Sequence, residues 1–198
     1  RNAAWYADTN LSANVALQDG ALAARINGRS NGSEVSAEFD LPNLFDITAE
    51  TRLDLTAKLA NSQAGTLLGQ MGLDSLPFDG DSDATLSLDL HQDGSQPART
   101  AMVYATDRTR ISAKGTAALS AEGFGEGRFE VALKSEDLEP TLLTAGIGLP
   151  QFGLGLPADM SATLAVAPQT VRFEDIRGQV GGNGVGGTVT VDRTAATA

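Results

Sequence analysis

The sequence contains no cysteine and a single histidine among its 198 residues. The missing thiols exclude disulfide bonds, thiolate metal sites and thiol nucleophiles. One imidazole is too few for a nitrogen-liganded zinc site, and a catalytic triad would have to use that imidazole as its base. The histidine, His91, ends an alternating segment beside Gln92-Asp93-Gly94, so we predict that it is exposed.

Aromatic residues are also scarce, at 5% of the chain, and long apolar runs are missing. No stretch approaches the roughly 18 consecutive apolar residues of a membrane-spanning helix. The net charge of −11 disfavours binding to nucleic acid or to anionic lipid surfaces by charge attraction. The sequence starts at Arg1 in mid-pattern and without a signal-peptide pattern, so we interpret residues 1–198 as one β-rich fragment of a larger protein.

Most of the chain alternates apolar and polar residues, a pattern typical of strands with one dry and one wet face. The dipeptides Asp19-Gly20, Asn27-Gly28, Asn31-Gly32 and Asn183-Gly184 predict tight turns. Strands are predicted over residues 11–17, 21–26, 35–41, 47–59, 84–91, 100–105, 110–119, 127–133, 160–166, 171–176 and 188–191. The phase of the alternation slips near Thr51, which predicts a bulge there.

Two short segments have helical spacing instead. The first covers residues 63–71, with Leu67 and Leu68 on one side and Asn61 as its expected N-cap. The second is expected to begin near Ser135 or Asp137, with Pro140 in its first turn. We therefore predict a mainly β fold: a long antiparallel meander sheet, curled or groove-forming, with two short helices at its rim.

An approximate internal repeat relates the two helical segments. Thr66-Leu67-Leu68 returns as Thr141-Leu142-Leu143, 75 residues later, and both copies have strands on either side. We predict repeats over residues 52–119 and 128–192, with a partial copy at residues 11–41. Repeats that stack in one dimension leave edges that pair with a neighbouring unit.

This order of strand, Thr-Leu-Leu helix, Leu-Pro loop and Gly-rich strands resembles the AsmA-like family of the Gram-negative envelope. The segments that carry the resemblance are residues 137–149, and residues 176–182 leading to residues 187–191. The resemblance implies a periplasmic segment of a larger AsmA/TamB-type protein, held at the inner membrane by an N-terminal anchor that this sequence lacks. It implies a long curled sheet with an apolar trough, and no catalytic residues.

From the resemblance and the dry face, we expect a non-catalytic periplasmic module of an envelope-biogenesis protein whose apolar sheet face binds or guides lipid acyl chains between membranes. Its partners would be acyl chains and the remaining domains of the same polypeptide, without nucleic acid or cofactors. Small side chains expected on the dry face, at Ala57, Ala105, Ala113 and Ala162, would leave room for a ligand. The alternative is a structural or adhesive β-repeat of the envelope without lipid binding.

Four further motifs have simpler interpretations. Residues 182–187 fit G-x-G-x-x-G, but strand-forming residues follow where a dinucleotide site needs a helix. Asp79, Asp81 and Asp83 have the spacing of a calcium loop, although its later glycine and glutamate positions hold other residues; a weak calcium site or a solvated loop are both open.

The acidic residues near the second helix are expected to favour its dipole. These residues are Glu136, Asp137 and Glu139. Trp5 and Tyr6 could form an aromatic anchor, but near a cut end we expect them to pack on a neighbour that is missing from this sequence. We predict no catalytic, cofactor-binding or metal-binding residues, and no enzyme activity.

Overall fold

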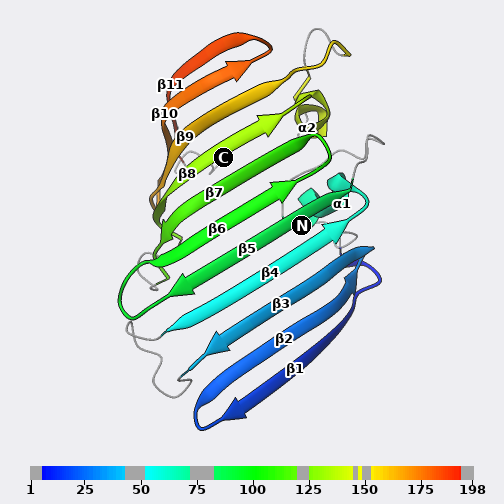
Figure 1. Ribbon diagram of the computed structural model, residues 1–198, viewed down its shortest axis with the longest axis vertical. Helices are drawn as coiled ribbons and strands as arrows, with labels where there is room; N and C mark the ends of the chain where they lie inside the picture. Colours follow the sequence, from blue (N-terminus) through cyan, green and yellow to red (C-terminus); the bar gives the residue numbers. More distant parts are fainter. Residues whose placement is uncertain are drawn as a thin grey trace, which may run out of the picture.

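The computed structural model describes residues 6–42, 52–71, 83–119, 125–144, 147–148 and 153–192. These residues form one sheet of eleven strands whose spatial order is their order along the chain (Figure 1). The strands are β1 (Asn10–Gln18), β2 (Ala21–Ser30), β3 (Ser33–Leu41), β4 (Leu53–Asn61), β5 (Ala84–Gln92), β6 (Ala98–Ala105), β7 (Thr109–Ala117), β8 (Gly127–Ser135), β9 (Ala158–Val166), β10 (Thr170–Val180) and β11 (Asn183–Asp192). The helices are α1 (Ala64–Gln70) and α2 (Glu139–Thr144).

The predicted antiparallel meander is confirmed, because every strand pairs antiparallel with the next one along the chain. The sheet does not close, since among the described residues β1 pairs only with β2, and β11 only with β10. The order of one strand, one helix and three strands occurs twice, from β4 to β7 and from β8 to β11. The 75-residue repeat itself stays a prediction, and the bulge near Thr51 lies outside the described residues.

Two of the predicted turns are confirmed. Asp19-Gly20 and Asn31-Gly32 connect their strands as two-residue loops, and all four residues have positive φ angles, between 46° and 84°. Such angles match a type I′ turn, whose twist fits the twist of the flanking strands. A third loop of this kind is Gly181-Gly182, with φ angles of 55° and 79°.

The predictions for the other two Asn-Gly dipeptides were wrong. Asn27 and Gly28 lie inside β2, where they pair with Ser36 and Val35. The Asn31-Gly32 loop, only a few residues later, fixes the register that places them there. Asn183-Gly184 begins β11, because the preceding glycine pair already forms the turn.

Register divides the side chains between an apolar face and a polar face, because directly paired residues point to the same side of a sheet. Three rows of mostly apolar side chains cross β4–β8 on the apolar face. The row nearest the helices holds Leu59, Leu86, Tyr104, Ile111 and Leu133. The next row holds Ala57, Leu88, Met102, Ala113 and Val131, and the third holds Leu55, Leu90, Thr100, Gly115 and Phe129.

Helix α1 covers one end of the apolar face. Its Leu67 is fully buried and packs in a cluster with Ala84 of β5 and Tyr104 of β6. Burial also raises the pKa of the Tyr104 hydroxyl above its ordinary value, because the charged form would be poorly solvated. In Figure 1 both helices lie at the same end of the strands, as the prediction of helices at the rim requires.

Asn61 does not cap α1 as predicted, because β4 extends to Asn61 and the helix N-cap is Gln63, which makes no side-chain cap bond. Instead, Asn61 Oδ1 accepts a hydrogen bond from the Gln63 backbone N–H at 2.7 Å, and its Nδ2 donates to Ser33 Oγ at 2.7 Å. Ser33 Oγ in turn donates to Gln70 Oε1 at 2.6 Å. This buried polar chain fixes the helix onto the turn between β2 and β3.

The N-terminal segment is fastened to the same helix. The Tyr6 hydroxyl donates a hydrogen bond of 2.7 Å to the Gln70 backbone oxygen. Tyr6 therefore contacts α1 of this chain, not only a neighbour outside it as expected, and its side chain stays 49% exposed. Trp5 lies outside the described residues.

The carboxylates beside α2 hold a loop. Asp137 Oδ1 accepts hydrogen bonds of 3.0 Å from the backbone N–H groups of Glu139 and Leu156. The buried Glu139 accepts a third, at 2.7 Å, from the N–H of Gly153. Their main contribution is therefore to satisfy backbone donors around this short helix, an effect that the sequence alone did not reveal.

Candidate functional sites

The apolar face extends across the neighbouring strands of the sheet. On the inner strands its side chains are mostly half-buried, whereas most of those on the polar face are exposed. Only eight hydrophobic residues among the described ones are buried outright, and α1 is the one element whose packing forms a buried cluster on this face. Side chains that are half-buried without a second layer shield one another while leaving a wide apolar surface within reach of a ligand.

Small residues line the middle of this face, as predicted for three of the four alanines. Ala57, Ala113 and Ala162 lie in the middle of the three rows, which also contains the larger Leu88, Met102 and Val131. The prediction for Ala105 was wrong, because it pairs with Thr85 and therefore lies on the polar face. Residues 101–105 are all apolar, so the sequence does not show which of them lie on the apolar face. The strand register decides it.

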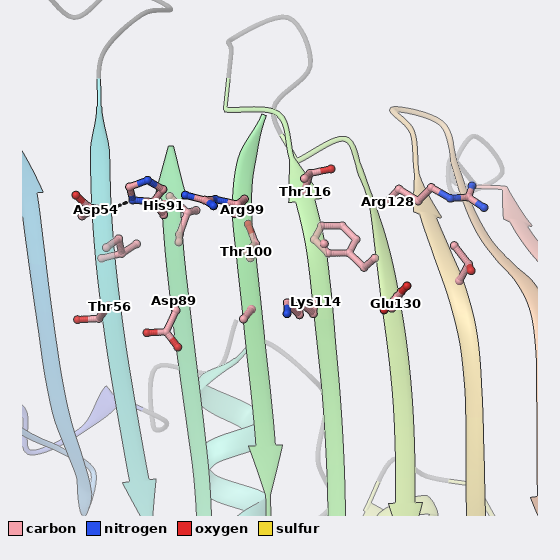
Figure 2. A pocket seen from close by; sticks show the side chains of 16 residues that line it. Asp54, Thr56, Asp89, His91, Arg99, Thr100, Lys114, Thr116, Arg128 and Glu130 are labelled. Carbon is pink, nitrogen blue, oxygen red and sulfur yellow. Dashed lines mark hydrogen bonds and ion pairs between the residues drawn. The ribbon is translucent and has the colours of Figure 1, made fainter. Parts of the chain in front are cut away.

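The polar face carries a hollow of about 780 Å³ that extends from β4 to β9. Figure 2 shows that the labelled side chains around it come from neighbouring strands, most of them charged, with Asp54 beside His91. Its cationic groups are Arg99, Lys114 and Arg128, but acidic groups such as Asp89 and Glu130 lie among them. This mixed lining gives the hollow no clear charge preference for a ligand.

His91 is not exposed as predicted, but half-buried, with 31% of its side chain accessible. Its Nδ1 donates a hydrogen bond to Asp54 Oδ1, because the register places Asp54 directly opposite it. This bond holds the pKa of Asp54 below its ordinary value; partial burial opposes the shift, and Arg52, at 2.9 Å from the carboxylate, adds to it. Asp54 and His91 lie far apart in the sequence, so no local sequence pattern predicts that they pair.

The arrangement is a hydrogen-bonded pair of an imidazole and a carboxylate. The acceptor of the imidazole N–H is a carboxylate, as in a triad, but the residues lining the hollow include neither serine nor cysteine as a nucleophile. Among the described residues, His91 hydrogen-bonds to Asp54 and to none of the threonines that line the hollow. The hydroxyl-activating geometry of nucleophilic catalysis is therefore missing from this part of the described chain.

The remaining motifs contribute no site within the described residues. Asp79 and Asp81 of the calcium-like spacing lie outside those residues, and among the described ones no cluster of acidic residues or histidine could hold a metal ion. The glycines at residues 182–187 form the end of a turn and the start of β11, so no helix N-terminus follows to hold a phosphate. In the described part of the chain, no helix is long and apolar enough to cross a membrane.

No family model, curated protein or solved structure matches this sequence. The resemblance to the AsmA-like family therefore stays a prediction, as do the periplasmic location and the inner-membrane anchor. What can be said of function comes from the geometry of the sheet.

Proposed function

We propose that this chain is a non-catalytic module whose apolar sheet face binds or guides acyl chains. The observation that supports the proposal is the set of apolar rows that cross the sheet without a second layer of structure over most of their width in the described residues. A closed core would have left no such surface. We further propose that the module belongs to an envelope-biogenesis protein of the periplasm.

The alanines of the middle row give the ligand room beside larger side chains. Ala57 and Ala113 are flanked on one side by Leu59 and Ile111, and on the other by Leu55 and Gly115. An acyl chain placed over these alanines would contact larger side chains such as Leu55, Leu59 and Ile111 and be shielded from water on burial. Each buried methylene stabilises such a complex by about 0.8 kcal/mol.

The face offers no strong polar group in its middle, which suits an acyl chain better than a polar ligand. Charged side chains of β4 and β8, such as Lys58 and Glu130, point to the opposite side of the sheet. A polar ligand would therefore lose its hydration on this face without gaining hydrogen bonds.

Filling the row tests the proposal. The variant Ala113→Trp places a bulky side chain in the row, and we expect it to reduce binding of a fluorescent fatty acid severalfold. The matched control is Ala132→Trp on the neighbouring strand, whose side chain lies on the polar face. We expect Ala132→Trp to bind like the unmodified chain.

A second measurement uses no added probe. Mass spectrometry of organic extracts from the purified chain should detect co-purified lipid, and less of it from Ala113→Trp. If the unmodified chain carries no lipid and binds no fatty acid, the acyl-chain function is wrong, and the structural or adhesive alternative takes its place.

A further inference from the structure

The outer edge of β1 is a long strand edge without the usual protection against pairing. Among the described residues no strand covers it, and all nine of its residues are exposed. Its apolar-face side chains include Leu11, Val15 and Leu17, which are 45%, 61% and 53% exposed. Natural edge strands are usually shortened, bulged or given charges or proline, and β1 has no charge, no proline and no register shift.

The direction of the strands limits how a second copy could extend this edge. Eleven alternating strands make β1 and β11 run in the same direction. If a second copy kept its apolar face on the same side, β11 of that copy could meet β1 only in parallel. For antiparallel pairing with both apolar faces on the same side of the sheet, β1 of one copy must meet β1 of the other. The two copies are then related by a two-fold axis normal to the sheet.

The backbone N–H and C=O groups of β1 point in the directions that this pairing needs. Gln18 and Ala21 close the Asp19-Gly20 loop, and the closing pair of such a hairpin exchanges both hydrogen bonds. Alternate residues of β1 therefore bond to β2, while the N–H and C=O groups of Ala13 and Val15 face the free edge. With Asn14 on the two-fold axis, Ala13 of each copy would form a hydrogen-bonded pair with Val15 of the other.

Side chains also match in this register. Leu11 would lie opposite Leu17 on the apolar face, and Asn10 opposite Gln18 on the polar face. The nearest charged side chains on the polar face, Arg25 and Arg29, lie on β2. The two β2 strands would be about 14 Å apart, beyond the screening length of about 8 Å at physiological salt. β1 itself is uncharged, although two acidic residues, Asp8 and Asp19, lie just beyond its ends.

The other edge is less suited. β11 contains three glycines among its ten residues, Gly184, Gly186 and Gly187, and it ends at Asp192. Glycine in a strand costs more backbone entropy on ordering and offers no side chain to pack. A pair of β11 strands would therefore gain less than a pair of β1 strands.

We propose that the edge of β1 is a docking site for β1 of a second copy of this chain, and that the resulting two-fold dimer continues both the sheet and its apolar face. Two-fold homodimers with self-complementary interfaces are the commonest soluble oligomers. The proposal concerns self-association and does not depend on acyl-chain binding.

A charge placed at Asn14, on the two-fold axis, tests the proposed dimer. In Asn14→Lys, two like charges would face each other across the axis, and we expect self-association in sedimentation equilibrium to weaken about fivefold or more. The matched control Asn27→Lys adds the same charge to the same face of β2 and should associate like the unmodified chain. Mixing Asn14→Lys with Asn14→Asp should restore association as a heterodimer.

Crosslinking gives a second, independent result. Because the chain has no cysteine, Asn14→Cys introduces the only thiol, at a non-hydrogen-bonded pair where Cα atoms are about 4.5 Å apart, within reach of a disulfide. Oxidation should give a disulfide-linked dimer that Asn27→Cys does not give. A chain that stays monomeric to high micromolar concentration, or a dimer that Asn14→Lys leaves unchanged, would overturn the proposal.

Discussion

The two faces of the sheet use the same backbone but have different roles. On the apolar face, side chains are half-buried among one another and are buried fully where α1 covers them. On the polar face, charged side chains form exposed ion pairs such as Arg25–Glu38, at 3.3 Å. Among the described residues, the buried cluster beneath α1 therefore lies on one face, while the other face keeps its charged side chains in contact with water.

The sharpest test of this comparison removes a side chain beneath the helix. Leu67→Ala deletes most of a fully buried side chain, and we expect the free energy of unfolding to fall by about 2–5 kcal/mol. Urea unfolding followed by circular dichroism measures the loss. The control is Val103→Ala on the polar face, which should lose clearly less. Equal losses in the two variants would contradict the division of roles.

Replacing a glycine within the sheet should lower the free energy of unfolding through a backbone clash, an effect that depends on neither face. A Cβ added to Gly115 would lie 2.0 Å from the backbone oxygen of Arg128, so the two strands would have to separate locally. We expect Gly115→Ala to lower the free energy of unfolding by about 1–3 kcal/mol. Gly184→Ala is the matched control, because a Cβ there meets nothing within 4 Å. A neutral Gly115→Ala would show that the strands adjust freely.

Acid should weaken one interaction of the polar face. The pKa of Asp54 is lowered in the folded state, so its contribution is present above its ordinary pKa, near pH 4, and disappears as the pH falls through the lower folded value. Asp54→Asn should therefore lose stability at neutral pH and lose less than the unmodified chain on acidification below about pH 4. Thermal melting at a series of pH values measures this, and parallel pH profiles would contradict it.

The smallest effect is expected from an exposed ion pair. Side chains of Arg25 and Glu38 are 71% and 58% exposed, so solvent screens their attraction. We expect Arg25→Ala to change the free energy of unfolding by less than about 1 kcal/mol. A double-mutant cycle with Glu38→Ala isolates the pair, and a coupling larger than this would mean that the polar face also stabilises the fold.

The meander could be predicted because its signals are local. Alternation predicted the strands, and Asp19-Gly20 and Asn31-Gly32 predicted two of the hairpins. The same kind of signal failed at Asn27-Gly28, because a turn dipeptide can also lie within a strand when the register demands it. The face of Ala105 could not be predicted, since its neighbours are all apolar.

The sequence by itself determined that this chain is an antiparallel meander with one dry and one wet face, because alternation and two-residue turns act between neighbouring residues. Only the tertiary structure decided which surfaces stay open. The pairing of His91 with Asp54, the coverage by α1 and the free edge of β1 all depend on contacts between residues far apart in sequence, or on their absence among the described residues. Such contacts are set by register across the whole sheet, and register is a collective property that no single segment encodes.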